Sequence, residues 1–144
     1  MYTYEYPRPA LTADIVLFDN TKSQVLLIKR GHEPFKDHWA FPGGFFDMSD
    51  TDIEHTAHRE LEEETGLRDV KLSLIHVASK EGRDPRGRTV TVIFTGQVDA
   101  DRVVPRGGDD AKEARWFRLD SLPPLAFDHD EILNLILNNK NTTN

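Results

Sequence analysis

One segment, Gly43 to Leu67, constrains this chain most because it crowds acidic residues onto a single predicted helix. Four glutamates fill all but one of five positions there: Glu60, Glu62, Glu63 and Glu64. Glu60, Glu63 and Glu64 lie at i, i+3 and i+4, so they share one helical face. Like charges at this spacing repel each other, and a bound cation relieves the repulsion. Because hard divalent ions such as Mg²⁺ take oxygen ligands, the acidic face predicts a metal site.

The residues around the glutamates predict a helix with defined ends. Thr51 and Glu54 have the spacing of a capping box at its start. Apolar residues at every fourth position predict a buried stripe, formed by Ile53, Ala57 and Leu61. Gly66 is placed to end the helix in the left-handed conformation, followed by Leu67 as an apolar contact. The preceding loop, Pro42-Gly43-Gly44, has a bare backbone that can approach a ligand or offer a carbonyl to a metal.

This segment, residues 44–67, resembles the Nudix box of the Nudix hydrolases. The second half of the box, Arg-Glu-apolar-x-Glu-Glu-x-Gly-apolar, matches at every specified position from Arg59 to Leu67. The first half departs from the family pattern, because Asp50 stands where the family has a glutamate. Eight residues rather than seven separate Asp50 from Arg59. In the family this glutamate mainly holds the loop against the helix, so the departure affects loop support more than metal binding.

The resemblance implies an α/β fold, an α/β/α sandwich with a mixed β-sheet, and a single domain over residues 1–144. It implies Mg²⁺ as the cofactor, with Mn²⁺ as an alternative ion. The metal ligands it implies are Gly44 through its carbonyl, Glu60, Glu63 and Glu64. A further acid from a loop beyond the box is expected, and Asp110 is chosen over Asp109 and Glu113. The alternative, that these three are ordinary loop carboxylates, has equal weight.

The reaction that the resemblance implies is hydrolysis of the pyrophosphate bond in a nucleoside diphosphate-linked substrate. A water made more acidic by the ion attacks phosphorus, with Glu63 or Glu60 as its base. Arg59 orients a glutamate through a bidentate pair. The expected catalytic residues are therefore Glu63, Glu60 and Arg59.

Other stretches resemble a narrower group, the ADP-ribose pyrophosphatases, which produce AMP and ribose 5-phosphate. These stretches are Trp39–Phe45, Gly82–Arg88, Gly108–Phe117 and Ala126–Ile132. Four arginines are candidate substrate contacts because a guanidinium fork suits phosphate: Arg30, Arg83, Arg86 and Arg88. The competing interpretation is that some of them only solubilise a loop or pair with Asp84.

Composition bounds the class of protein. The chain has 144 residues, 38% of them hydrophobic, a net charge of −7 and no cysteine. That size fits one domain, and the absence of cysteine excludes disulfides and thiolate chemistry. An acidic chain is a poor partner for nucleic acid or membranes, and no signal peptide or membrane-spanning run is present. We therefore expect a cytoplasmic protein that binds neither nucleic acid nor membranes. The resemblance implies a small nucleotide as its partner and allows a homodimer, since dimers are common among relatives.

The remaining elements alternate strands with a second helix. Strands are expected at Ala13–Asp19, Gln24–Arg30, Val70–Ala78, Arg88–Val98 and Ala114–Leu119, and Trp39–Phe41 is a short apolar stretch that enters the glycine loop. The second helix is expected over Asp128–Asn139, with Asp128 and Glu131 as a capping box and Ile132, Leu135 and Ile136 inward. Ile75 breaks the alternation of its strand. Met1 to Pro9 carries alternating tyrosines and is expected to form an edge strand, an aromatic wall for a base or a swapped dimer arm.

Histidines give no clear metal site. His55 and His58 are three residues apart on the acidic helix, but the flanking register favours surface positions over a zinc site. His129 is expected in the core or as a cap of the second helix rather than in a cleft.

Two other functions are consistent with the pattern. Some relatives use this fold to sense ADP-ribose and carry a DNA-binding winged helix, which the sequence to Asn144 does not contain. A house-cleaning hydrolase of modified nucleoside triphosphates, similar to MutT, would differ in the products it forms.

Overall fold

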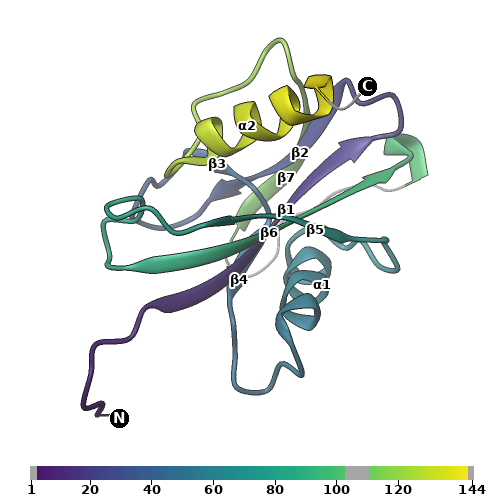
Figure 1. Ribbon diagram of the computed structural model, residues 1–144. Helices are drawn as coiled ribbons and strands as arrows, with labels where there is room; N and C mark the ends of the chain where they lie inside the picture. Colours follow the sequence, from purple (N-terminus) through teal and green to yellow (C-terminus); the bar gives the residue numbers. More distant parts are fainter. Residues whose placement is uncertain (1–2, 103–110, 143–144) are drawn as a thin grey trace.

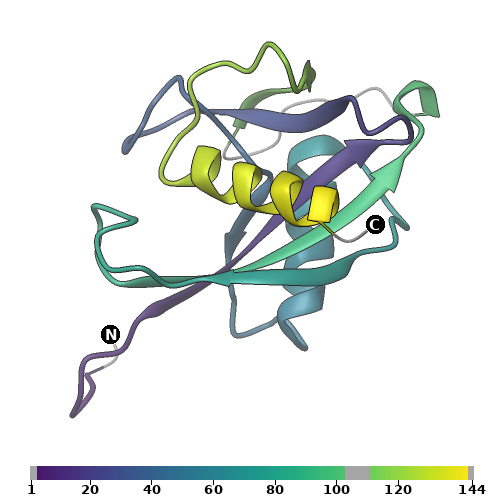
Figure 2. The same ribbon diagram turned by 45° about the horizontal axis from the view of Figure 1, so that its top comes forward.

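The computed structural model describes residues 3–102 and 111–142. In chain order its elements are β1 (Ala10–Asp19), β2 (Gln24–Arg30), β3 (Trp39–Ala40), β4 (Gly43–Phe45), α1 (Ile53–Thr65), β5 (Ser73–Ala78), β6 (Thr89–Val98), the short 3₁₀ helix η1 (Ala100–Arg102), β7 (Ala111–Arg118) and α2 (His129–Thr142). The strands form a single sheet, and the two helices lie on its opposite faces (Figures 1 and 2).

The sheet mixes parallel and antiparallel pairs. Its strand order is β3-β2-β1-β6-β5, with β4 pairing with β1 and β7 pairing with β2. β1 and β6 run parallel along their whole length, from Ala10 opposite Thr89 to Asp19 opposite Val98. The other pairs are antiparallel. The predicted α/β fold with a mixed sheet between helices is therefore confirmed.

Strand β1 is mostly apolar, and its residues from Thr12 to Asp19 are buried, because both of its faces are covered. Val16 and Phe18 pack on the side that holds α2, with Ile132 and Ile136 of that helix. Ile15, Leu17 and Ala13 pack on the other side with Ala57 and Leu61 of α1. The alternation of side chains along one strand thus divides the core into two layers.

Each strand expected from Ala13 onward is present, but β1 and β7 begin three residues earlier than expected, β5 begins at Ser73 rather than Val70, and β4 was not expected. β2 has the predicted bounds, and β5 carries a register shift between Leu74 and His76, where Ile75 breaks the sequence alternation. The expected edge strand before residue 10 is wrong: β1 begins at Ala10, and Tyr4 and Tyr6 are exposed. Tyr4 and Tyr6 therefore bury no face against the sheet, and residues 3–9 form no strand.

The acidic helix α1 begins two residues later than the predicted cap. Asp52, not Thr51, is the N-cap, and its carboxylate accepts a hydrogen bond from the His55 backbone N–H at 2.8 Å. The predicted capping box of Thr51 and Glu54 is therefore wrong, because Asp52 fills the role of the side-chain acceptor. The Thr51 backbone N–H instead donates to His55 Nδ1 at 3.0 Å. The C-terminus is as predicted, with Gly66 at φ 81° and Leu67 buried.

Helix α2 turns a different face inward than the sequence suggested. Ile132 and Ile136 are buried as predicted, but Leu135 is 43% exposed and Leu133 is buried in its place. Residues 132, 133 and 136 lie within one stripe at 100° per residue, whereas residue 135 lies outside it. Among the described residues, neither helix is both long and apolar enough to cross a membrane.

The α2 correction makes a matched pair of variants informative. We expect Leu133→Ala to lower the free energy of unfolding by about 2–5 kcal/mol, because it opens a cavity in the core. Leu135→Ala should change it by less than about 1 kcal/mol, because its side chain is largely in solvent. Urea denaturation followed by circular dichroism measures both values. Equal losses in the two variants would contradict this orientation of α2.

Candidate active site

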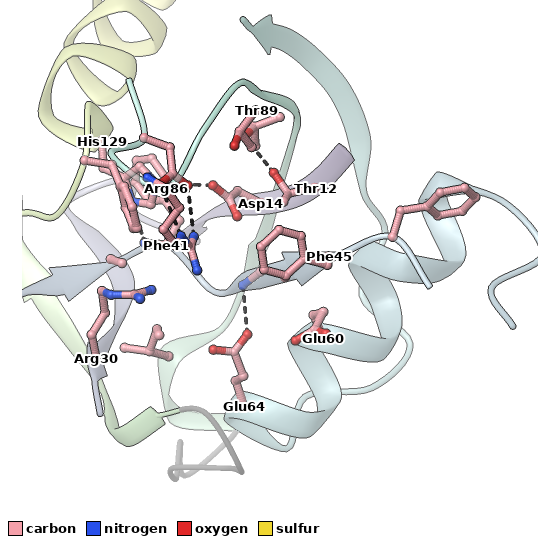
Figure 3. A pocket seen from close by; sticks show the side chains of 18 of the residues that line it. Thr12, Asp14, Arg30, Phe41, Phe45, Glu60, Glu64, Arg86, Thr89 and His129 are labelled. Carbon is pink, nitrogen blue, oxygen red and sulfur yellow. Dashed lines mark hydrogen bonds and ion pairs between the residues drawn. The ribbon is translucent and has the colours of Figure 1, made fainter. Parts of the chain in front are cut away.

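A cavity of about 590 Å³ opens where β1, β4, α1, the loop 79–88 and the start of α2 meet. This volume is typical of a small-molecule site. In Figure 3, Glu60 and Glu64 face the cavity from α1, while Arg30, Arg86, Phe41 and His129 lie on its other side. Acidic and basic side chains therefore oppose each other across one space.

The acidic side consists of Glu60 and Glu64, which lie one helical turn apart and are both buried. The backbone N–H of Gly43 donates to Glu64 Oε1 at 2.9 Å. Burial raises the pKa of Glu64 well above its ordinary value, and the Gly43 hydrogen bond offsets only part of this effect. Burial also raises the pKa of Glu60, against the lowering effect of Arg59. The two carboxylates are thus held where a full negative charge on both is unfavourable.

Gly44 brings bare backbone against this acidic pair. A Cβ atom at Gly44 would lie 2.5 Å from the carboxyl carbon of Glu60, so no other residue fits without displacing that side chain. Two buried carboxylates beside exposed backbone form a donor set that suits a hard divalent cation, which would also remove their repulsion. Among the described residues, no three acidic, histidine or cysteine side chains converge as a metal site. Mg²⁺ commonly binds through one or two carboxylates and completes its shell with water and phosphate.

Asp50 provides the loop support that the sequence left in question. Arg59 Nε donates to Asp50 Oδ1 and Arg59 Nη2 donates to Asp50 Oδ2, both at 2.9 Å. The Asp47 backbone N–H and the Thr56 hydroxyl also donate to Oδ2. The Arg59 hydrogen bonds hold the pKa of Asp50 well below its usual range. A shorter side chain with one additional loop residue therefore still reaches the arginine.

Arg59 extends this network to the acidic side. Its Nη1 donates to Glu60 Oε1 at 2.7 Å, and its Nη2 donates to the Phe45 carbonyl at 3.1 Å. Arg59 thereby contacts both a cavity glutamate and the end of β4. Its bidentate partner is Asp50 and not the predicted glutamate, and its orienting role stays a prediction. Glu63 is different: its side chain is 47% exposed, lies 3.5 Å from Arg59 Nη1, and does not line the cavity.

Three of the four predicted arginines line the cavity, namely Arg30, Arg83 and Arg86. Arg88 is exposed and does not line it. Arg30 Nε donates to the Pro34 carbonyl at 2.7 Å, and burial together with the charge of Arg86 lowers the pKa of Arg30. A guanidinium stays charged at neutral pH despite such a shift.

Arg86 lies between two aromatic rings. Its guanidinium carbon is 5.2 Å from the centre of the Phe45 ring and 5.6 Å from that of Phe127. A bidentate pair with Asp84 orients the guanidinium. Burial acts to raise the pKa of Asp84, but the Arg86 hydrogen bonds lower it below the ordinary value. Phe127 itself has a φ of 54°, a backbone conformation that bulky residues rarely adopt.

Arg83 is a buried anchor rather than an open cation. Its Nε and Nη2 donate to the two oxygens of Asp128 at 2.9 Å, and its Nη1 donates to the Thr91 hydroxyl at 2.6 Å. The predicted capping box is therefore wrong for Asp128, whose carboxylate pairs with Arg83, while the Glu131 N–H donates to Asp130. A buried arginine needs an acidic partner. Asp128 is that partner for Arg83, although it lies far away in the sequence.

Sequence reasoning missed part of the cavity. Asp14, Phe45 and Phe127 line it, and His129, expected in the core or as a cap, is buried but also lines the cavity. Asp14 could have been found, because a carboxylate within the continuous apolar run of β1 requires a buried partner. His55 and His58 are exposed, as predicted. Asp109 and Asp110 lie outside the described residues, and Glu113 pairs with Arg115 at 2.9 Å.

Comparison with known proteins decides the family. The NUDIX domain model matches residues 8–136. The chain belongs to the Nudix family. The acidic helix, the glycine loop and the Asp50–Arg59 pair are therefore the Nudix box of this protein. The family match and a 42% identity to a protein named ADP-ribose pyrophosphatase support the prediction that this Nudix protein is an enzyme, a pyrophosphohydrolase.

Similar proteins include both enzymes and regulators. This Nudix protein is 42% identical over 136 residues to a Methanocaldococcus jannaschii protein named ADP-ribose pyrophosphatase, covering 94% of this chain and 78% of the relative. It is 35% identical to the ADPR responsive transcriptional repressor NtrR of Acinetobacter baylyi, covering 94% of this chain but only 57% of the repressor. The NUDIX domain of Shewanella oneidensis NrtR, solved with ADP-ribose, superposes with a TM-score of 0.85 at 29% identity, covering 93% of this chain and 90% of that one.

The raised pKa values give this Nudix protein an unusual stability profile without metal. The folded state keeps protons on Glu60 and Glu64 to higher pH than the unfolded chain does. Their contribution to stability is therefore complete below the ordinary glutamate pKa of 4.5 and is lost as the pH rises through the raised values. In EDTA at pH 8, Glu64→Gln should melt above the wild type, by about 3 °C for each pKa unit of elevation.

The matched control is Glu62→Gln, which removes a more exposed carboxylate from the same helix. Its melting temperature should follow that of the wild type across the pH range. For Glu64→Gln the difference should shrink toward pH 5, and saturating Mg²⁺ should reverse it by stabilising only the wild type. Identical profiles for wild type and Glu64→Gln in EDTA would contradict the burial of a repelling pair.

Proposed function

We propose that this protein hydrolyses ADP-ribose to AMP and ribose 5-phosphate with a bound divalent ion, Mg²⁺ or alternatively Mn²⁺. The observation that carries the proposal is a buried acidic pair facing arginines across one cavity. The identity to an archaeal ADP-ribose pyrophosphatase supports the choice of substrate. A small nucleotide is then the ligand, while a homodimer and the absence of nucleic-acid binding stay predictions.

The acidic side would hold the metal ion. Glu60, Glu64 and the Gly44 carbonyl are the ligands we assign, with Glu63 and Asp110 as further predicted ligands. A divalent ion bound there neutralises phosphate charge and makes a water more acidic. Arg59 keeps Glu60 in place through the 2.7 Å hydrogen bond from Nη1. The carboxylates thus stay aimed at the phosphates before substrate arrives.

The basic side would hold the substrate's diphosphate and sugars. Arg30 and Arg86 line the cavity opposite the acids, and each guanidinium can bind phosphate with its planar fork. The rings of Phe45 and Phe127 flank Arg86 and offer flat apolar surface to a base. Arg83 acts through its pair with Asp128 by holding the loop that carries Arg86. Arg88 stays a predicted contact.

The bond changes are simple. The oxygen of one water forms a bond to a phosphorus of the diphosphate, and the bond from that phosphorus to the bridging oxygen breaks. The water's proton passes to a carboxylate base, and the bridging oxygen leaves with the second phosphate. Glu63 and Glu60 are the two predicted bases. Glu60 lines the cavity, whereas Glu63 does not line it and lies 3.5 Å from Arg59 Nη1.

A second function, sensing of ADP-ribose without turnover, is favoured by one finding. Two of the similar proteins are an ADPR responsive repressor and an NrtR domain solved with ADP-ribose. A sensor would share the cavity and the arginines but would bind the ligand intact. Turnover, rather than affinity, therefore separates the two functions.

The proposal is tested by incubating the protein with Mg²⁺ and ADP-ribose and separating the products chromatographically. We expect AMP and ribose 5-phosphate, and no products in EDTA. Glu63→Gln and Glu60→Gln, tested separately, should identify the base by a loss in kcat of about 10²–10⁴-fold. Tight binding with no products would support the sensor, and pyrophosphate release from nucleoside triphosphates alone would support a MutT-like hydrolase.

Arg86→Ala tests the substrate side of the cavity. We expect KM for ADP-ribose to rise about 10–100-fold, because a charge-assisted hydrogen bond to phosphate contributes roughly 1.5–3 kcal/mol. Arg68→Ala is the control, since Arg68 is an exposed arginine outside this cavity. Steady-state kinetics measure both variants. An unchanged KM in Arg86→Ala would remove Arg86 from the substrate contacts.

A further inference from the structure

We propose that His129 is a positioning residue of the acidic site, although it belongs to α2 on the opposite face of the sheet from α1. Through a hydrogen bond from the Phe41 N–H and a close polar contact with Asp14, it would fix the loop Pro42-Gly43-Gly44, from which Glu64 receives a hydrogen bond. The inference rests on the proposed function only in taking this loop as part of the metal site.

Both ring nitrogens of His129 are used, and the ring is only 4% exposed. The Phe41 backbone N–H donates to His129 Nδ1 at 3.1 Å, although the two residues lie 88 positions apart. His129 Nε2 lies 3.2 Å from Asp14 Oδ2. The ring is also stacked on that of Phe41, with centres 4.4 Å apart and planes 13° apart. These three contacts leave the imidazole one orientation.

The hydrogen bond from Phe41 also determines where the ring carries its proton. A backbone N–H can only donate, so Nδ1 must accept and has no proton of its own. The proton is therefore on Nε2, the nitrogen that lies 3.2 Å from Asp14 Oδ2. This is the pattern in which one nitrogen's partner fixes the role of the other.

Asp14 passes the constraint to the glycine loop. Asp14 and Gly43 are direct partners in the β1–β4 register. A Cβ at Gly43 would collide with Asp14 Oδ1, so this carboxylate lies directly against the bare backbone of Gly43. The N–H of Gly43 then donates to Glu64 Oε1 at 2.9 Å. A continuous path of contacts thus runs from His129 through Asp14 and Gly43 to Glu64.

Core packing alone does not explain a histidine at this position. Apolar residues already fix α2 against the sheet, namely Ile132, Leu133 and Ile136. A buried imidazole is costly unless both nitrogens find partners, and an apolar ring would fill the space without that cost. What the imidazole adds is a hydrogen-bonded link between the start of α2 and the loop that faces α1. Figure 3 shows His129 and Phe41 together, beside Asp14.

Three substitutions separate the contributions of the ring. His129→Phe keeps the stacking on Phe41 but removes the hydrogen bond from the Phe41 N–H and the polar contact with Asp14. His129→Asn keeps an acceptor near the position of Nδ1, and His129→Gln keeps a donor near that of Nε2. His58→Gln is the control, because His58 is an exposed histidine of α1 that does not line the cavity.

The direct measurement is amide hydrogen exchange by ¹H–¹⁵N NMR without metal or nucleotide. In His129→Phe we expect exchange at Phe41 and Gly43 to accelerate at least about tenfold, because their local restraint is lost. His129→Asn should restore protection at Phe41 more than at Gly43, and His129→Gln should do the reverse. Wild-type protection at both amides in His129→Phe would overturn the inference. A urea midpoint for each variant shows whether the fold is retained, and the Asn and Gln variants decide the matter if the Phe variant unfolds.

The functional measurement is Mn²⁺ binding followed by electron paramagnetic resonance. We expect His129→Phe to bind Mn²⁺ about 10–100-fold more weakly, the range found when a group supporting a metal ligand is removed. At saturating Mn²⁺, kcat should fall while KM for ADP-ribose stays within about threefold. A raised KM with unchanged Mn²⁺ affinity would instead make His129 a substrate contact and overturn the positioning role. Inactivity of the wild type on ADP-ribose would refute the proposed function but not the inference, because the exchange measurement requires no turnover.

Discussion

The repulsion between two buried carboxylates, Glu60 and Glu64, is the constraint to which the rest of this site responds. Two such groups one turn apart on a helix disfavour their own ionised state, and burial increases the effect. Each is therefore held by a donor from outside the pair: the Gly43 N–H for Glu64 and the Arg59 guanidinium for Glu60. Those donors keep the carboxylates in place but do not cancel the repulsion, which the cation of the proposed function would relieve.

The supports of the acidic pair come from both faces of the sheet. On the α1 side, the Asp50–Arg59 pair links the loop after β4 to the helix. On the α2 side, His129 contacts Phe41 and Asp14. Phe41 directly precedes the glycine loop, and Asp14 of β1 is the register partner of Gly43. A short loop held in this way from two layers allows its backbone atoms little displacement. Such restraint suits a reaction in which placement of charge accounts for most of the rate enhancement.

Much of this structure followed from local sequence patterns. Alternating apolar and polar residues and short apolar runs predicted the strands. Apolar residues at every fourth position, Ile53, Ala57 and Leu61, predicted the side of α1 that packs on the sheet. The failures have local and distant causes. Asp52 and Leu133 were missed because neighbouring residues offered equally good alternatives for a cap or an inward face.

The distant failures concern pairs that no local pattern reveals. Arg83 and Asp128 are 45 residues apart, and His129 meets Phe41 across 88 residues. Asp50, which stands where the family has a glutamate, shows a related limit of prediction from sequence. A departure from the family pattern suggested weaker loop support, but the extra residue before the helix compensates for the shorter side chain, and only the three-dimensional contacts show this.

The burial of Arg83 has a consequence for how this fold can diversify. Its ties to Asp128 and Thr91 fasten the loop 79–88 near its middle, while Pro85 and Gly87 at the tip are exposed. Mutations at the tip can therefore accumulate without loosening the strands or the acidic helix. Over evolutionary time, the side chains that this loop offers to a ligand could change while the acidic pair on α1 stays unchanged, because separate contacts hold the two parts.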